Sequence, residues 1–146
     1  MKRRYKSGCL VAVLLVLPLL VTACGGKSAS DTAAEPAVVK HVAGTDVYRI
    51  TLSAETAKRL DVKTAAAQRS GGETAIPYSA VLYSATGEAS AYVNPAPLTF
   101  VRQTIVVDRI HGNRALLSGG LAAGTRVVTV GVPELHGIES GIGGGQ

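Results

Sequence analysis

The segment LTFVRQTIVVDRIHGNRALLS, residues 98–118, decides the fold. Its first part is rich in β-branched and aromatic side chains, which are typical of strands. His111, Gly112 and Asn113 then interrupt the run, and residues of this kind are typical of a tight turn between antiparallel strands. RALLS, residues 114–118, returns with apolar side chains. The segment therefore predicts a long strand, a turn and a second strand.

Segments on both sides repeat this pattern. TAIPYSAVLYSATGEASAYVN, residues 74–94, has two β-rich runs around Thr86 and Gly87, which predicts a hairpin. Residues 46–52 alternate in polarity and are rich in β-formers, so they predict a strand. Residues 126–130 are nearly all β-branched, which favours a strand in the interior of a sheet.

Prolines and glycines mark where regular pairing is expected to stop. Pro95 and Pro97 lack the backbone N–H that a ladder needs, so they forbid regular pairing for a few residues. QRSGGE, residues 68–73, predicts a turn or short loop after an extended segment at 62–67. GGLAAG, residues 119–124, leads into a strand rather than a helix, so it predicts a tight turn and not a dinucleotide-binding loop.

One short helix is expected after the strand at 46–52. Ser53 is suited to cap residues 54–60, because its hydroxyl can accept a hydrogen bond from a free backbone N–H. Glu55 in the first turn and Lys58 and Arg59 in the last turn have the charges that a helix dipole favours.

The end of the chain predicts less regular structure. VPELHG, residues 132–137, predicts one helical turn with Pro133 at its start and Gly137 past its end. IESGIGGGQ, residues 138–146, is expected to fray. Together the segments predict a mainly β, antiparallel domain, a small roll or partly open barrel with one short helix.

The amino-terminal residues predict a signal peptide, residues 1–23. Four basic residues precede an apolar run of 14 residues from Leu10 to Ala23. A transmembrane helix is the first alternative, but spanning a bilayer needs roughly 20 residues. A plain secretory signal followed by an ordinary buried cysteine is the second.

The end of this run favours a third interpretation. Val21, Thr22, Ala23 and Cys24 resemble the lipobox of bacterial lipoproteins, which implies cleavage before Cys24 and attachment of a diacylglyceryl group to its thiol. The chain is therefore expected to be anchored in a lipid bilayer on the extracytoplasmic side. Two acyl chains anchor a protein firmly, whereas one holds it only marginally.

The cleaved chain divides into a tether at 24–45, a β domain at 46–139 and a frayed tail at 140–146. The tether is small and polar, although Ala37, Val38 and Val39 are an alternative first edge strand. Removal of the signal leaves 11 basic against 10 acidic residues, so charge gives no case for a nucleic-acid partner. With Cys9 removed and Cys24 lipidated, no disulfide is expected.

Catalytic motifs are not found, so no enzyme activity is expected. His41, His111 and His136 lie far apart in the sequence. Asp108 or Glu134 could complete a metal site with one of the last two, but solvent-facing turn residues are the favoured interpretation. We therefore expect neither a metal nor a cofactor. Four aromatic residues lie on the predicted strands: Tyr78, Tyr83, Tyr92 and Phe100. They could form a stacking surface for a sugar or drug, but aromatic residues on strands more often belong to the core or to cross-strand pairs, which is the favoured interpretation.

Four segments, in this order, resemble the membrane-proximal domain of periplasmic adaptor subunits (membrane fusion proteins) of RND-type efflux systems. They are VYRITLSAETAKRLDVKTAAA at 47–67, IPYSAVLYSATGEASAYV at 76–93, FVRQTIVVDRI at 100–110 and ALLSGGLAAGTRVVTVGVPEL at 115–135. In that family a barrel domain, a lipoyl-like domain and a helical hairpin separate the two halves, whereas here only residues 68–73 lie between them.

The resemblance implies one adaptor module carried alone on a lipid. It implies a non-enzymatic accessory or interaction domain for transmembrane transport or efflux, with the ectodomain of an RND or ABC-type transporter as partner. A small-ligand or metal-binding envelope lipoprotein is the alternative.

Overall fold

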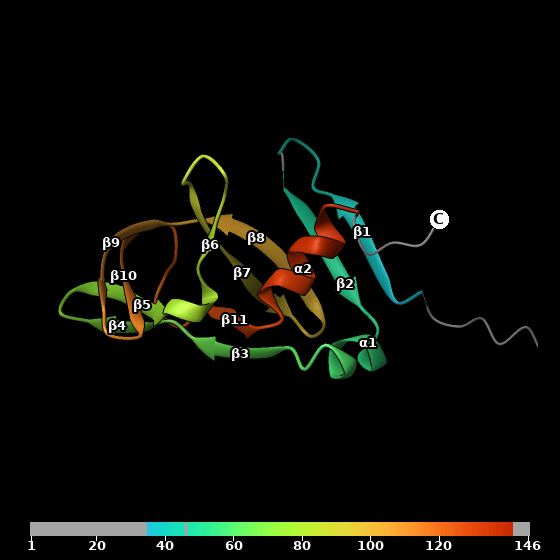
Figure 1. Cartoon of the computed structure of the whole chain (residues 1–146), viewed down its shortest axis with the longest axis horizontal. Helices are drawn as coiled ribbons and strands as arrows, with labels where there is room; N and C mark the ends of the chain where they lie inside the picture. The colour runs from blue at the N-terminus through green and yellow to red at the C-terminus, as the bar shows by residue number, and fades with distance from the viewer. Residues whose placement is uncertain (1–34, 46, 142–146) are drawn as a thin grey trace, which may run out of the picture. The chain divides into compact units, whose positions relative to one another are not determined.

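A computed structural model describes residues 35–45 and 47–141 and confirms a mainly β fold built from two antiparallel sheets. The larger sheet pairs β1 (Ala37–His41), β2 (Tyr48–Leu52), β8 (Thr99–Thr104), β7 (Ala89–Ala96), β11 (Arg126–Val130) and β3 (Lys63–Ala66) in that order, with β6 (Leu82–Tyr83) on β7. The smaller sheet pairs β4 (Gln68–Ser70), β5 (Glu73–Pro77), β10 (Arg114–Gly119) and β9 (Val106–His111) in that order. Two α-helices, α1 (Ala54–Arg59) and α2 (Val132–Glu139), and a 3-10 turn, η1 (Tyr78–Ala80), complete the described part (Figure 1). The sheets are not closed into a barrel.

The long strand predicted after Leu98 is divided between the two sheets. Ile105 lies at the bend between β8 and β9, is buried, and donates its N–H to the carbonyl oxygen of Ala89 at 3.0 Å. Gly120 lies against this bend with φ +99°, and a Cβ there would lie 2.6 Å from the Ile105 Cα atom. Glycine is therefore required at the position where the chain passes from one sheet to the other.

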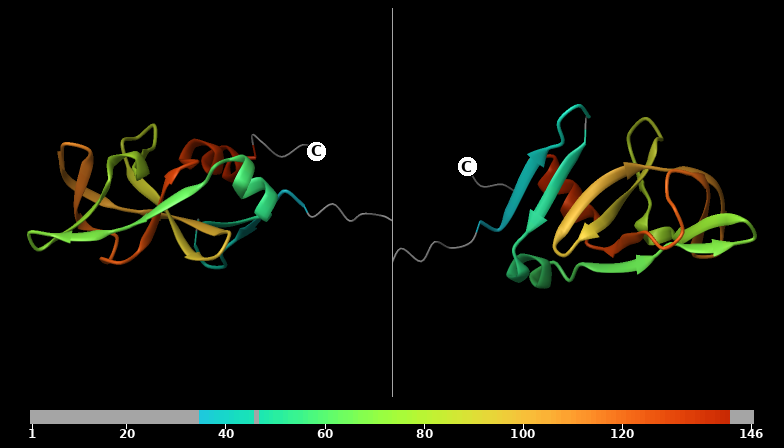
Figure 2. Two further views of the ribbon diagram at one scale, coloured as in Figure 1. Left: turned by 90° about the horizontal axis from the view of Figure 1, so that it is seen from below. Right: turned by 180° about the vertical axis from the view of Figure 1, so that it is seen from behind.

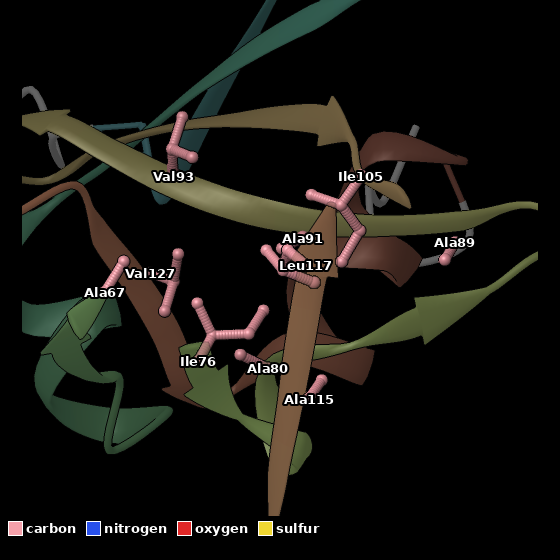
Figure 3. Close-up of a cluster of buried hydrophobic side chains, with 10 residues drawn as sticks. All are labelled: Ala67, Ile76, Ala80, Ala89, Ala91, Val93, Ile105, Ala115, Leu117 and Val127. Atoms are coloured by element: carbon pink, nitrogen blue, oxygen red, sulfur yellow. The ribbon is translucent and has the colours of Figure 1, made fainter. Parts of the chain in front are cut away.

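Each face of the larger sheet has its own core. Successive residues of a strand point to opposite faces, and in β7 Ala91 and Val93 point to one core while Tyr92 points to the other. The first core lies between the two sheets (Figure 3), and its buried members are Ala67, Ile76, Ala80, Ala89, Ala91, Val93, Ile105, Ala115, Leu117 and Val127. The second lies under the helices, and its buried members are Ile50, Leu52, Tyr92, Phe100, Val128, Val132 and Leu135.

Several sequence predictions are confirmed. Ser53 caps α1, and its hydroxyl accepts a hydrogen bond from the Thr56 N–H at 3.1 Å. The turn at Gly112 joins β9 to β10, and β11 is an interior strand between β7 and β3. The hairpin around Thr86 and Gly87 exists as β6–β7, although β6 is only two residues long.

The tether predicted at residues 24–45 is wrong for its last part, because Ala37–His41 forms β1. All five residues pair with β2, with Ala37 opposite Leu52 and Val39 opposite Ile50. This pairing extends the apolar face of the sheet, which explains why a short small-residue segment is ordered as an edge strand. The alternative of a first edge strand is therefore the observed one. Residues 1–34, with the predicted signal peptide and Cys24, lie outside the described residues.

The turn or short loop predicted at residues 68–73 is confirmed as a turn at Gly71 and Gly72, but Gln68–Ser70 before it forms the strand β4, which pairs with β5 and was not predicted. Gly71 and Gly72 have φ of +57° and +91°. Positive φ at both central positions is typical of the two-residue turn that matches the twist of antiparallel strands. The glycine pair therefore joins two paired strands.

The helical turn predicted to end before Gly137 continues to Glu139, and the fraying predicted for Ile138 and Glu139 is wrong. Glycine inside a helix costs about 1 kcal/mol relative to alanine. Two contacts offset that cost, because Ile138 packs against the second core and Glu139 bonds to two strand side chains. The Ser140 N–H closes the helix on the His136 carbonyl oxygen at 3.0 Å. Residues 142–146 of the predicted tail lie outside the described residues.

Candidate interaction surface

The site residues considered from the sequence do not come together. Cys24 lies outside the described residues, and His41, His111 and His136 lie on β1, β9 and α2. The His41 ring packs edge-on against Tyr48 with 5.1 Å between ring centroids. Within residues 35–45 and 47–141, no three His, Cys, Asp or Glu side chains are grouped so that they could hold a metal ion.

The four aromatic residues divide into two pairs. Tyr92 and Phe100 are 0% and 3% exposed and belong to the second core. Tyr78 and Tyr83 are 45% and 46% exposed, on η1 and β6. The core interpretation is confirmed for the first pair, and the four side chains do not form one stacking surface.

A buried polar cluster, which we call the α2 clasp, was not predicted. It consists of Tyr92 on β7, Arg102 on β8 and Glu139 at the end of α2. The Arg102 Nε donates to the Glu139 Oε1 and Oε2 atoms at 3.1 and 2.9 Å, and the Tyr92 hydroxyl donates to Oε2. The Glu139 side chain is only 4% exposed, compared with 36% for Arg102.

The contacts of the clasp keep the Tyr92 hydroxyl protonated. Burial, together with the hydrogen bond and charge of Glu139, raises the pKa of Tyr92 far above its usual range, although the nearby Arg102 charge opposes this. Tyr92 therefore remains a donor, and both carboxylate oxygens of Glu139 are already occupied. No sequence signal links these residues, because Glu139 is 37 positions from Arg102 and 47 from Tyr92.

The smaller sheet carries a second group of charges on its surface. The Arg109 guanidinium donates to Glu73 at 3.1 and 2.6 Å and to Asp108 at 2.6 Å. Hydrogen bonds to these two carboxylates raise the pKa of Arg109. Since Glu73 is on β5 and Arg109 on β9, the pair spans the intervening strand β10.

The outermost strand on one side of both sheets is a single continuous segment, Lys63–Ser70, which we call the β3–β4 edge. β3 ends the larger sheet and β4 ends the smaller one, with only Ala67 between them. Figure 2 shows β3 running on into β4. Ala67 is 3% exposed and packs in the first core, so the segment is fixed at the point where it changes sheets.

No strand of residues 35–45 or 47–141 pairs with the outer side of this edge. Ala67 donates its N–H to the Thr125 carbonyl oxygen at 2.8 Å and accepts from the Gly124 N–H at 2.7 Å, so its polar groups face the residues that lead directly into β11. In an antiparallel ladder, successive residues alternate in the direction of these groups. The N–H and C=O of Thr64 and Ala66 therefore face away from β11, beyond the end of the sheet.

A cavity of about 260 Å³ lies at the bend of the edge. One side comes from the edge itself and the other from the β5–β10 pair, and the lining residues are Ala65, Ala66, Gln68, Pro77, Asn113 and Arg114. Arg114 donates to the Gln68 Oε1 atom at 2.7 Å, so the two sides are connected. The alanines leave space beside the open backbone.

A second cavity, of about 340 Å³, lies between β1, α1 and α2. Its lining is largely apolar, from Pro36, Ala37, Leu60 and Ile138, with the charged residues Arg59 and Glu134. Its lining suits a small apolar ligand.

No protein-family model, curated protein or solved structure matches the chain. Neither helix of the described ranges combines the length and apolar character needed to cross a bilayer.

Proposed function

We propose that the protein is a non-enzymatic interaction domain, anchored by lipid at Cys24 on the extracytoplasmic face of a cell membrane, and an accessory to a membrane transporter. The observation that carries the interaction role is that, within the described residues, both sheets end in strands with no strand paired on their outer side: β1 and β3 in the larger sheet, and β4 and β9 in the smaller. An open strand presents backbone donors and acceptors that a partner strand can pair with. Exposed apolar side chains on β9, Val106 at 56% and Ile110 at 44%, add contact area.

The position of β1 supports action close to the membrane. Ala37 follows Cys24 by 13 residues, and a fully extended chain covers about 3.5 Å per residue. The start of β1 can therefore lie no more than about 45 Å from the anchored cysteine. A β domain beginning at residue 46 would have had a reach of about 75 Å by the same rule. The partner is accordingly expected to be a membrane protein or its ectodomain.

The lipid anchor is tested with Cys24→Ser, using Cys9→Ser as the matched control. We expect labelled palmitate on the wild type and on Cys9→Ser, both in the membrane fraction. Cys24→Ser should carry no label and leave the membrane fraction after washing with salt. Mass spectrometry that finds Cys24 unmodified in the mature wild type would overturn the anchor.

The transporter role comes from the resemblance to adaptor membrane-proximal domains, which implies the ectodomain of an RND or ABC-type transporter as partner. It is tested by purifying the lipidated full chain in a mild detergent, with and without prior cross-linking in the intact cell. We expect a transporter subunit to co-purify in stoichiometric amount. Recovery of the chain alone under both conditions would overturn the role.

The alternative of a small-ligand lipoprotein is supported by the apolar cavity between β1, α1 and α2. Its test is an apolar fluorescent probe added to the full chain in detergent, compared with Ile138→Trp, whose larger side chain fills the cavity. Saturable binding that this variant abolishes would favour the alternative over the interaction domain. Calorimetry with Zn²⁺ and Cu²⁺ tests its metal-binding form, for which we expect no stoichiometric binding.

A further inference from the structure

We propose that the β3–β4 edge binds an extended, acidic segment of the partner protein as an added strand. This inference rests on the proposed interaction role and specifies its site and the chemistry of its ligand. Three features that meet at this edge carry it: backbone groups directed away from the sheet, an adjoining cavity, and arginines that no carboxylate of the described residues pairs with.

The backbone supplies the general affinity. Thr64 and Ala66 direct their N–H and C=O groups away from β11, so an antiparallel or parallel strand can pair with them without any change in the sheet. Strand addition of this kind takes most of its affinity from main-chain hydrogen bonds and its specificity from pockets for alternate side chains. Small side chains at Ala65 and Ala66 allow the added strand to approach.

The cavity at the bend supplies such a pocket. Its polar groups, Gln68, Asn113 and Arg114, can donate hydrogen bonds to an incoming side chain. Arg114 is already oriented by its hydrogen bond to Gln68. A guanidinium held in place favours a carboxylate, which it can bind through two parallel N–H groups.

Charge extends this preference along the whole edge. Arg69, Arg114 and Arg126 have no carboxylate within 4.0 Å among the described residues, whereas Lys63 is paired with Asp61 at 2.8 Å. Arg126 donates instead to the Thr64 hydroxyl. The nearby acidic residue Glu73 is occupied by Arg109. The edge is therefore positive and complementary to an acidic strand.

Two other occupants are disfavoured, one by charge and one by the absence of aromatic side chains from the cavity lining. A second copy paired through this edge would bring the same arginines together, and like charges across a strand pair destabilise it. A single-stranded nucleic acid is bound by stacking of its bases on aromatic side chains. The cavity lining contains no aromatic residue.

The test is solution NMR on the isotope-labelled full chain in detergent micelles, titrated with a short blocked peptide of alternating threonine and glutamate. We expect the amide signals of Thr64 and Ala66 to shift and their hydrogen exchange to slow. The matched control is a peptide of alternating threonine and lysine, which should cause neither effect. Absence of both effects, shifts confined to β1 or β9, or equal binding of the lysine peptide would overturn the inference.

Two pairs of variants distinguish the contribution of charge to peptide binding from that of the backbone hydrogen bonds. Arg114→Glu should weaken binding of the acidic peptide about tenfold, since it replaces an attraction by a repulsion, while Lys40→Glu on the opposite edge strand should leave it unchanged. Ala66→Pro removes the outward N–H and should abolish binding, while Ala66→Val retains it and should bind. Equal affinity of Arg114→Glu and Lys40→Glu would overturn the role of charge even if Ala66→Pro does not fold.

Co-purification of the transporter distinguishes this inference from the proposed function. If Arg114→Glu and Lys40→Glu both retain the transporter and the acidic peptide does not bind, the partner docks elsewhere and only the inference fails. If the wild type retains no transporter but binds the acidic peptide at Thr64 and Ala66, the edge is a strand-binding site and the transporter role fails.

Discussion

The two faces of the larger sheet are built on different principles. Five of the ten buried residues of the first core are alanine, whereas none of the seven in the second core is. Small side chains let the two sheets approach closely. The packing of the first core then depends on the backbone geometry at the bends between the sheets. Large side chains fill the wider space under the helices. The stability of the first core therefore depends on how closely the backbone segments approach one another, and the stability of the second core on the volume of its side chains.

The clasp adds a further difference. In the second core, Tyr92, Arg102 and Glu139 make directed hydrogen bonds that fix the end of α2. The first core is made of apolar side chains alone, and its register is fixed where Ala67 and Ile105 change sheets. Substitutions should therefore act on the two faces by different mechanisms, which the following predictions compare.

The largest effect is expected from Leu135→Ala, which removes volume from the second core. Leu135 is fully buried. Its truncation should lower the free energy of unfolding by about 2 to 5 kcal/mol, because the variant buries less apolar surface and also leaves a cavity. Urea unfolding followed by circular dichroism measures the loss. Val130→Ala, at a side chain 40% exposed, is the control and should change stability by less than about 0.5 kcal/mol. Equal losses would contradict a volume-dependent second core.

The comparable test of the first core is Gly120→Ala against Gly124→Ala. Both glycines have positive φ, +99° and +91°, so both variants carry backbone strain. Only at position 120 would the added Cβ collide with the backbone, 2.6 Å from the Ile105 Cα atom and the Thr104 carbonyl oxygen. We expect a loss of about 3 kcal/mol at 120 and about 1 kcal/mol at 124, by urea unfolding. Equal losses would show that close approach does not limit this face.

Removing the carboxylate of the clasp should have an intermediate effect. Glu139→Ala leaves the Tyr92 hydroxyl and the Arg102 guanidinium without their partner, at a cost of about 2 kcal/mol. This value is below that of a fully buried ion pair because Arg102 reaches solvent, with 36% of its side chain exposed. Glu134→Ala on the exposed side of the same helix is the control and should change little. Hydrogen exchange should also show faster opening of the last turn of α2 in Glu139→Ala only.

The strands of this molecule could be predicted from the sequence because their signals are local. Alternating and β-branched runs identify β2, β8 and β11, and the hydroxyl of Ser53 identifies the start of α1. The turn at Gly71 and Gly72 could be predicted, whereas the strand β4 before it was missed, because its residues are polar and strands at the edge of a sheet need not be apolar.

The remaining features depend on contacts between distant residues. Ala37, Val38 and Val39 offered an edge strand as the alternative to a tether, and the pairing of β1 opposite Ile50 and Leu52 decides between the two. The clasp joins residues far apart in the chain, and the β3–β4 edge becomes a site only when Arg114 is brought beside it. The chemistry of each residue could be predicted from the sequence, whereas which residues lie in contact depends on the fold.

The smallest effect, Tyr92→Phe, tests the clasp by its pH dependence. Below pH 10 the hydroxyl is protonated in both states, and its hydrogen bond to Glu139 contributes about 1 kcal/mol, which the variant loses. Above the ordinary tyrosine pKa of 10.0, the unfolded chain releases the proton while folded Tyr92, whose pKa is raised, retains it. Stability of the wild type should therefore fall relative to Tyr92→Phe as pH rises above 10. Tyr78→Phe, at an exposed tyrosine, is the control and should follow the wild type across the same range. A difference between wild type and Tyr92→Phe that stays constant from pH 8 to pH 11 would mean that the hydroxyl ionises in the folded state, and the clasp would then not hold it as a donor.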